Sequence, residues 1–180
     1  SAEDGKVLWR NAWRGRTAVV PTPIFHDGQV YISSGYGVGC RKITIGADNK
    51  VVQDYHNRNI KNQHGGVLLH DGHLYGYSDG RGWTCQNFNN GEVVWDSKEF
   101  GKGCVSYADN RLYCVEESSG KVALAEASTS GWKEHGQFKL DPQTELRKPA
   151  GRVWTHPVVA NGVLYLRDQE LLFAFDIKAN

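Results

Sequence analysis

The stretch HDGQVYI at residues 26–32 combines a two-residue turn with the start of an alternating segment rich in β-branched and aromatic side chains. Asp-Gly suits the positive φ angles of a type I′ turn, so the stretch predicts a β-hairpin. Related stretches recur as HDGHLYG at 70–76, ADNRLYC at 108–114 and ANGVLYL at 160–166, each with a tyrosine three residues after its turn centre. The chain therefore repeats one hairpin four times.

A second turn phrase accompanies each hairpin: DGKVLW at 4–9, DNKVVQ at 48–53, NGEVVW at 90–95 and, more weakly, SGWKEH at 130–135. Its turn residues are 44, 42 and 40 positions apart, at Gly5, Asn49, Gly91 and Gly131. Two hairpins in a period of about 40 residues give four strands per unit, which is typical of a β-propeller blade. The units contain no helical half, and this disfavours a helical solenoid.

These repeats predict four blades, at about residues 19–55, 65–96, 103–140 and 153–178. The last blade has only three strand-like segments, whereas KVLWR at 6–10 precedes the first blade and has no blade of its own. We therefore expect residues 6–10 to complete the last blade, and residues 141–152 to form a loop-like insertion. The sequence thus predicts an all-β, single-domain β-propeller of four-stranded antiparallel blades.

Charge and hydropathy exclude two classes of partner. Lys and Arg number 21 against 20 for Asp and Glu, which gives a net charge of +1 and no strong field for nucleic acid or anionic membranes. No apolar run approaches the roughly 20 residues that a transmembrane helix needs. We expect neither a nucleic-acid partner nor a membrane span.

The segment CQNFNNGEVVW at 85–95 resembles the eleven-residue tryptophan-docking motif of quinoprotein-type propellers. The motif's places are filled as follows: Cys85, Asn87, Asn90, Gly91 and Trp95. The motif is also divided between the chain ends, with AFD at 174–176 similar to its front and DGKVLW, including Gly5 and Trp9, similar to its back. The chain is identified as a member of the PQQ-like, quinoprotein-type or BamB-like propeller repeat proteins of bacteria.

This resemblance implies a structural docking role for Trp9, Trp95, Gly5, Gly91 and Asp176. Gln53 and His135 occupy the tryptophan place in the first and third blades, so we expect those junctions to be less regular. The resemblance also implies a periplasmic or exported setting. The chain is then either a C-terminal part of a ring of about seven or eight blades, or four blades completed by a second copy or by another protein.

Quinone catalysis in this family is associated with adjacent cysteines, a calcium ion and a catalytic carboxylate. Cys40, Cys85, Cys104 and Cys114 include no adjacent pair, so we expect no PQQ, calcium or other metal in this chain and no catalytic residues. We expect the cysteines to be small buried hydrophobes. Cys104 and Cys114 flank one hairpin, where a three-residue loop would place them opposite each other and a two-residue turn would not, so a disulfide between them stays open.

Aligning the blades on their turns places Thr22, Gly66, Cys104 and His156 at the start of the innermost strand, which lines the channel of a propeller. A basic and aromatic set is expected at one channel mouth: Gln63, His64, Lys102, Arg152, Trp154 and His156. Such a set suits an anionic or planar ligand, with Arg for bidentate contacts and Trp for stacking. The alternative is a solvated rim around a water-filled channel.

The sequence favours a non-catalytic scaffold that binds a ligand or a protein. One alternative is a fragment of a PQQ-dependent alcohol dehydrogenase. A second alternative is a carbohydrate-binding propeller, with Trp83 and Trp132 as the exposed aromatic residues.

Overall fold

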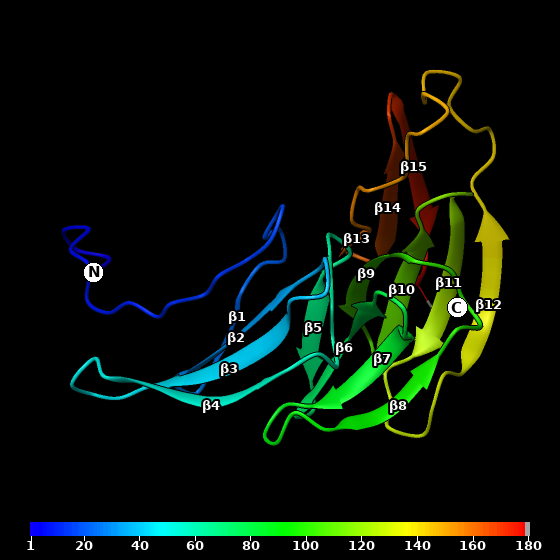
Figure 1. The fold of residues 1–180 in the computed structure, drawn as a ribbon. Coiled ribbons are helices and arrows are strands. Elements are labelled where there is room, and N and C mark those ends of the chain that lie inside the picture. Colours follow the sequence, from blue (N-terminus) through cyan, green and yellow to red (C-terminus); the bar gives the residue numbers. More distant parts are fainter. Residues whose placement is uncertain (179–180) are drawn as a thin grey trace.

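The structure of the protein is a computed structural model that describes residues 1–178. These residues form fifteen strands in four antiparallel sheets, and they contain no helix. The predicted all-β class with four blade-like sheets is confirmed. The sheets follow one another along an open arc (Figure 1).

The first sheet comprises β1 (Ile24–His26), β2 (Gln29–Ser34), β3 (Gly39–Ile45) and β4 (Val51–Asn57). The second sheet comprises β5 (Val67–His70), β6 (His73–Ser78), β7 (Gly82–Asn87) and β8 (Val93–Ser97). The third sheet comprises β9 (Gly103–Ala108), β10 (Arg111–Glu116), β11 (Lys121–Glu126) and β12 (Glu134–Lys139). The fourth sheet comprises β13 (Val158–Ala160), β14 (Val163–Asp168) and β15 (Leu171–Asp176).

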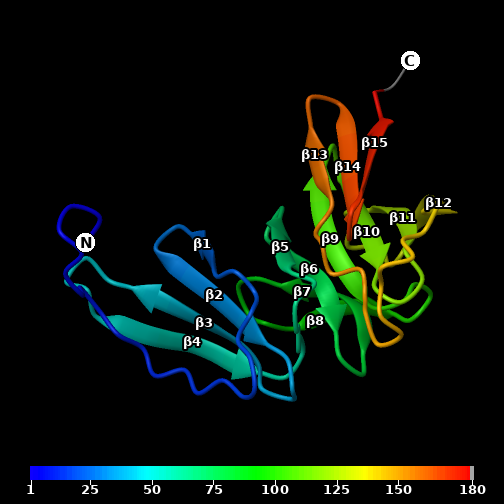
Figure 2. The ribbon, with the colours of Figure 1, turned by 90° about the horizontal axis from the view of Figure 1, so that it is seen from above.

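Within each sheet, neighbouring strands are consecutive in the chain. Figure 2 shows β1, β5, β9 and β13 along the concave side of the arc and β4, β8 and β12 on the outer side. The predicted hairpin turns connect the first two strands of every sheet, with positive φ at both central residues: Asp27 and Gly28, Asp71 and Gly72, Asp109 and Asn110, Asn161 and Gly162. Short polar residues and glycine tolerate this conformation, which is why these residue types mark the repeat.

The tyrosine of each repeat shows how the sheets pack. Tyr31, Tyr75 and Tyr113 are 1%, 2% and 8% exposed, because each is covered by the following sheet. Tyr165, in the same place on β14, is 37% exposed. No sheet follows it among the described residues. The core of the molecule is therefore a series of layers between successive sheets.

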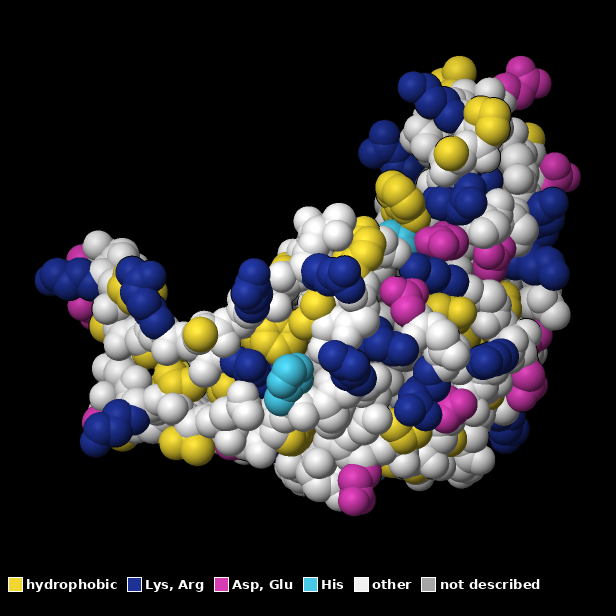
Figure 3. Space-filling model, in the orientation of Figure 1, with side chains coloured by type: hydrophobic (Ala, Val, Ile, Leu, Met, Phe, Trp, Pro, Cys, Tyr) yellow, Lys and Arg dark blue, Asp and Glu magenta, His cyan; other side chains and the backbone are white. Residues whose placement is uncertain are grey.

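The predicted completion of the fourth sheet by residues 6–10 is wrong for this structure. The fourth sheet has three strands, and residues 6–10 form no strand and are exposed. The physical reason is the open shape of the arc: the N-terminal segment lies beside the first sheet, at the opposite end from β15 (Figures 1 and 2). Figure 3 shows a hollow between the two arms of the arc.

Trp95 connects the second and third sheets. It lies opposite Cys85, its ring centroid is 6.2 Å from that of Tyr75, and its Nε1 donates a hydrogen bond to the Ser128 carbonyl at 2.9 Å. The indole thus reaches from β8 to the third sheet. Its amphipathic ring covers apolar surface while its N–H finds an acceptor.

Tyr55 has the corresponding place in the first sheet, where Gln53 was expected. A β-bulge after Gln53 shifts the register, so Tyr55 is the residue that lies opposite Lys42 and faces the second sheet. Its hydroxyl donates to the Phe88 carbonyl at 3.1 Å, and its ring lies against Gly91, where an added Cβ would be 2.9 Å from the ring. The first junction is therefore closed by an aromatic ring, and the expectation of irregularity there is wrong.

The third junction has no ring at this position, although Phe138 of β12 contacts Phe175 of β15, with 5.0 Å between ring centroids. A β-bulge on β12 leaves His135 unpaired in the ladder and places Gly136 opposite Leu124. His135 instead contacts Glu126, with 3.1 Å between Nε2 and Oε2. At this junction, Gly136 therefore occupies the position that Tyr55 and Trp95 occupy at the other two.

Candidate functional site

Five of the side chains predicted at the channel mouth lie together on the concave side of the arc. Gln63 and His64 precede β5, Lys102 precedes β9, and Trp154 and His156 precede β13. The inner strands converge there, and the segments that lead into them bring these residues together although they are up to 93 positions apart in the chain.

Lys102 is the basic residue at the centre of this cluster, and its charge is already paired. Its Nζ donates to Gln63 Oε1 at 2.6 Å and to Asp79 Oδ1 at 2.8 Å. The Gln63 amide in turn donates to the Tyr36 hydroxyl at 2.6 Å. Because a carboxylate neutralises the ammonium group, this lysine offers little attraction to a free anion.

Glu117 joins the cluster, and the sequence reasoning missed it. Its Oε2 lies 2.8 Å from His64 Nε2 and accepts a hydrogen bond from Trp154 Nε1 at 3.1 Å. The His64 and Trp154 rings meet edge to face, with 5.1 Å between centroids. Glu117 lies in the turn after β10, outside the strand positions on which the repeats were aligned. The sequence therefore offered no signal for it beyond its acidic side chain.

His64 is partly buried. Burial lowers the pKa of the imidazole below its ordinary value, and the nearby Glu117 carboxylate opposes this effect. Neither ring nitrogen makes a hydrogen bond of good geometry, although Nε2 lies within ion-pair distance of Glu117, and Nδ1 is buried with no partner of either kind. A neutral imidazole carries one N–H and one unprotonated nitrogen. Nδ1 can therefore donate or accept one further hydrogen bond, depending on the tautomer.

A cavity of about 430 Å³ opens beside this cluster. It is lined by Val20, Tyr36, Gln63, His64, Trp154 and His156. A smaller cavity of about 190 Å³ adjoins it and includes Thr22 and Gly66, two residues expected at the start of the inner strands. His156 closes one side, with its Nε2 2.8 Å from the His64 carbonyl oxygen. The walls are mainly apolar and aromatic, as in small-molecule sites.

Arg152 does not join the cluster. Its guanidinium donates to the Gly151 carbonyl at 2.9 Å, and within residues 1–178 no hydrogen bond or ion pair joins it to the other mouth residues. Trp154, by contrast, is 57% exposed and presents ring surface for stacking. The cluster therefore combines aromatic rings with two carboxylates, Asp79 and Glu117, that are paired with Lys102 and His64.

The remaining candidates concern metals, cysteines and membranes. No group of three or more His, Cys, Asp or Glu side chains within residues 1–178 is placed to hold a metal ion. The cysteines are free and buried, and the two-residue turn at Asp109–Asn110 separates Cys104 from Cys114, which forms no disulfide with it. The described part of the chain includes no helix with the length and hydropathy to cross a bilayer.

The two end faces of the arc expose apolar side chains. On the fourth sheet, Tyr165 and Leu172 are exposed, and on the outer face of the first sheet, Phe25 is exposed. The N-terminal segment adds exposed Val7, Leu8 and Trp9. Large apolar side chains that are exposed on a face no other sheet covers favour an interaction surface there.

A family model described as "Outer membrane protein assembly factor BamB" matches residues 1–97, which is more than half of the chain. The chain belongs to this family. The predicted resemblance to PQQ-like, BamB-like propellers is thereby confirmed. No curated protein sequence matches the chain significantly.

Solved structures agree with the BamB-family assignment at the level of fold. BamB from Moraxella catarrhalis is 14% identical with a TM-score of 0.64, over 87% of this chain and 42% of that one. The computationally designed Ika4 protein is 10% identical with a TM-score of 0.63, over 97% of this chain and 99% of that one. A europium-containing methanol dehydrogenase is 14% identical with a TM-score of 0.50, over 68% of this chain and 26% of that one. The chain thus spans less than half the length of BamB and the full length of Ika4.

Proposed function

We propose that the chain is a non-catalytic scaffold in an exported setting, and that it binds protein by completing its open fourth sheet. The protein partner is a second copy of the chain. The exported setting rests on membership in a family described as an outer membrane protein assembly factor. The observation that carries the proposal is the uncovered end face of the fourth sheet, at Tyr165 and Leu172.

Leu172 occupies a place that is buried in every other sheet. Leu172 pairs with Arg167, which comes two residues after the repeat tyrosine Tyr165. In the other three sheets, the residues at the same position are Cys40, Trp83 and Val122. Those three are at most 2% exposed, whereas Leu172 is 70% exposed. Burying a leucine side chain stabilises an interface by about 1.5–3 kcal/mol, so this face favours a covering sheet.

The N-terminal segment has the local structure of a fourth strand that lacks its sheet. One hydrogen bond, from the backbone N–H of a residue to the side chain two positions earlier, recurs at three turns: Lys6 to Asp4 at 3.2 Å, Lys50 to Asp48 at 3.1 Å and Glu92 to Asn90 at 3.0 Å. The last two turns lead into β4 and β8. Residues 6–10 are therefore prepared to begin a strand at a sheet edge such as that of β15.

The register of this pairing follows from the second sheet. Cys85 lies opposite Tyr75 on one side and Trp95 on the other. Ala174 lies opposite Tyr165 and has no partner on its other side among the described residues. Pairing residues 6–10 with β15 in the same way places Trp9 opposite Ala174, where its ring covers the end face that holds Tyr165.

A second copy satisfies both open ends at once. Each chain carries an open sheet edge at β15, a spare strand at residues 6–10 and an exposed apolar residue, Phe25, on the outer face of its first sheet. Two chains related by a twofold axis would exchange these contacts symmetrically and close the ring.

The test is the mass of the chain in solution by light scattering during size exclusion. We expect twice the 20.1 kDa of one chain, and a monomer at micromolar to 100 micromolar concentration would overturn the proposal. Leu172→Asp should weaken association by about 100-fold or more, because each of two symmetric contacts loses about 1.5 kcal/mol of burial and gains a charge. Leu146→Asp is the matched control, since Leu146 is 67% exposed in the 141–152 segment and should leave the mass unchanged.

The competing class is a quinoprotein dehydrogenase. Calcium binding takes six to eight oxygen ligands, several of them carboxylates. The residues described do not fit such a centre, because they hold no cluster of three or more His, Cys, Asp or Glu side chains, and the two carboxylates at the mouth, Glu117 and Asp79, are paired with His64 and Lys102. Dye reduction by the purified chain on addition of PQQ and calcium would overturn the non-catalytic assignment.

A carbohydrate-binding role through Trp83 and Trp132 is not supported. Trp83 is buried and its Nε1 donates to the Gly101 carbonyl at 3.0 Å, while Trp132 stacks on Phe100 with 6.0 Å between ring centroids. These two rings fill the junction between the second and third sheets. They are unavailable as exposed sugar platforms.

A small-ligand role at the mouth rests on one specific observation, the exposed ring of Trp154 beside the unpartnered His64 Nδ1. These groups suit a planar ligand with a polar edge. Binding of such a ligand should quench tryptophan fluorescence and should be lost in Trp154→Ala but kept in Trp132→Phe. Equal quenching in both variants would exclude the mouth as the site.

A further inference from the structure

The third junction contains an apolar pocket at the place where the other two junctions hold an aromatic ring. In each complete sheet, the residue that follows the bulge of the outer strand faces the next sheet: Tyr55, Trp95 and Gly136. Each of these residues pairs with a third-strand residue that itself lies opposite the repeat tyrosine: Lys42, Cys85 and Leu124. The three residues therefore occupy equivalent positions in their sheets.

The two rings that are present share one arrangement. Each lies against the next sheet and donates its polar tip to a backbone carbonyl there, Tyr55 to Phe88 and Trp95 to Ser128. Both acceptors lie just after the third strand of the next sheet. These junctions therefore show what the fold accommodates at this place: an aromatic ring with an O–H or N–H donor.

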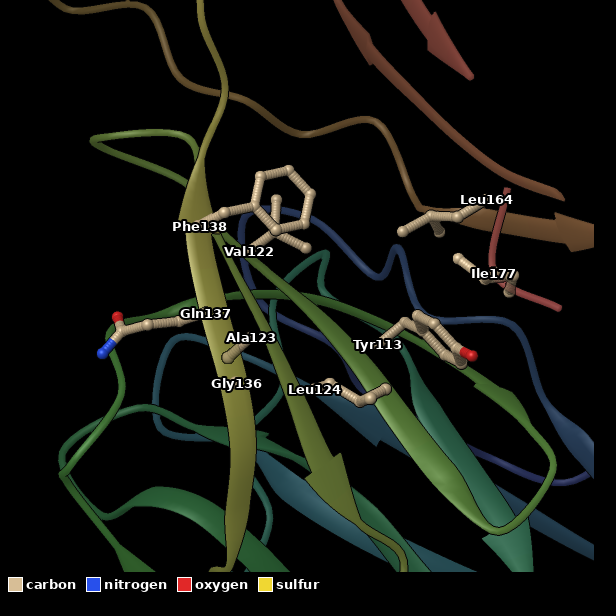
Figure 4. A pocket seen from close by; sticks show the side chains of 9 residues that line it. All are labelled: Tyr113, Val122, Ala123, Leu124, Gly136, Gln137, Phe138, Leu164 and Ile177. Carbon is tan, nitrogen blue, oxygen red and sulfur yellow. The ribbon is translucent and has the colours of Figure 1, made fainter. Parts of the chain in front are cut away.

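At the third place, Gly136 leaves a pocket of about 400 Å³ between the third and fourth sheets. Figure 4 shows Val122 and Phe138 on one side and Tyr113, Leu164 and Ile177 on the other. None of the lining residues is charged. A volume of this size lies within the usual range of small-molecule pockets.

The glycine is required neither by backbone conformation nor by crowding. Its φ angle is not positive, and a Cβ added at this position would meet no atom within 4 Å. A larger side chain would therefore fit at residue 136. The missing side chain is what keeps the pocket open.

The next sheet also offers the corresponding acceptor. The Ile177 N–H donates to the Gly162 carbonyl at 2.9 Å, as the Phe88 N–H donates to the Gly72 carbonyl at 2.9 Å. Ile177 thus has the place of Phe88, whose carbonyl accepts the Tyr55 hydroxyl. The Ile177 carbonyl is the counterpart acceptor for a ring in the pocket.

We infer that the pocket beside Gly136 is a binding site for a small neutral aromatic molecule with one N–H or O–H donor, of the size of indole. The ring replaces the docking side chain that this junction lacks, and its donor binds the Ile177 carbonyl. Cavities lined by aliphatic and aromatic side chains take up small aromatic molecules. This site is separate from the sheet edge and does not depend on the pairing of two chains.

The test uses indole as the probe and the full chain as the protein. We expect saturable binding by calorimetry and a rise in the melting temperature at millimolar indole. Gly136→Trp should fill the pocket and abolish both effects, whereas Val94→Trp, which adds a tryptophan at the exposed bulge position of β8, should bind like the wild type. Absence of binding to the wild type, or undiminished binding to Gly136→Trp, would overturn the assignment.

Two further measurements keep the test informative if Gly136→Trp does not fold. The methyl NMR signals of Leu164 and Ile177 in the wild-type chain should shift on addition of indole, and unshifted signals would overturn the site. Benzothiophene has the shape of indole without the donor, and it should bind roughly 2- to 10-fold more weakly, the value of one hydrogen bond. Equal affinity would overturn the contact with the Ile177 carbonyl.

Discussion

Replacing Trp95 tests whether the sheets are coupled by the rings at their junctions. Trp95→Ala removes an indole that lies 6.2 Å from Tyr75 between ring centroids and donates to the Ser128 carbonyl at 2.9 Å. Removing a buried tryptophan costs about 3–5 kcal/mol, and the lost hydrogen bond accounts for about 1 kcal/mol of such a change. Because Trp95 is half-buried, we expect the lower end, about 3 kcal/mol of unfolding free energy.

Urea unfolding followed by circular dichroism measures this loss, and Trp95→Phe separates its parts. Phenylalanine keeps an aromatic ring but loses the donor, so we expect about 1–1.5 kcal/mol. Val94→Ala, at the neighbouring exposed position, is the matched control and should stay within about 0.5 kcal/mol. If Trp95→Ala costs less than about 1 kcal/mol, the indole does not couple the sheets and the reasoning is refuted.

Three other outcomes follow from buried titratable groups. Arg147→Ala leaves the buried Asp168 carboxylate without its ion-pair partner and should reduce the unfolding free energy by about 3–5 kcal/mol at pH 7, measured by urea unfolding. The pKa of His64 is lowered in the folded chain, so protonation of this residue favours unfolding. The unfolding free energy should be highest above the unfolded pKa near 6.5 and should fall as the pH drops below it. His64→Gln should flatten that part of the pH profile. Burial raises the pKa of Cys85 to about 11 and of Cys104 to about 12, so both thiols should react with Ellman's reagent only after urea is added, and rapid reaction of the native chain would contradict this burial.

The repeat pattern predicted much of the fold because its turns carry backbone information. Asp27-Gly28 and its counterparts adopt the positive φ angles that these residue types favour. Spacing alone gave the wrong residue where a β-bulge shifts the register of the ladder. The bulge after Gln53 moves the docking place to Tyr55, and a bulge has no sequence signal strong enough to fix its position.

The site shows the same limit. Register placed Gln63, His64 and Trp154 near one another because they precede equivalent strands. Glu117 was missed because it reaches the cluster from a turn, and the charge of Lys102 was overvalued because its pairing with Asp79 depends on tertiary contacts. Long-range pairing of side chains is not encoded in the period of a repeat.

Gly136 also affects how the molecule comes apart. In a chain of repeats, the stability of each unit depends on its own contacts and on the interface with its neighbour. The interface before β13–β15 lacks the ring that seals the two earlier ones, and no sheet covers its other face among the described residues. The fourth sheet should therefore open as a cooperative unit of its own, with its amide protons exchanging with solvent before those of β6 and β7.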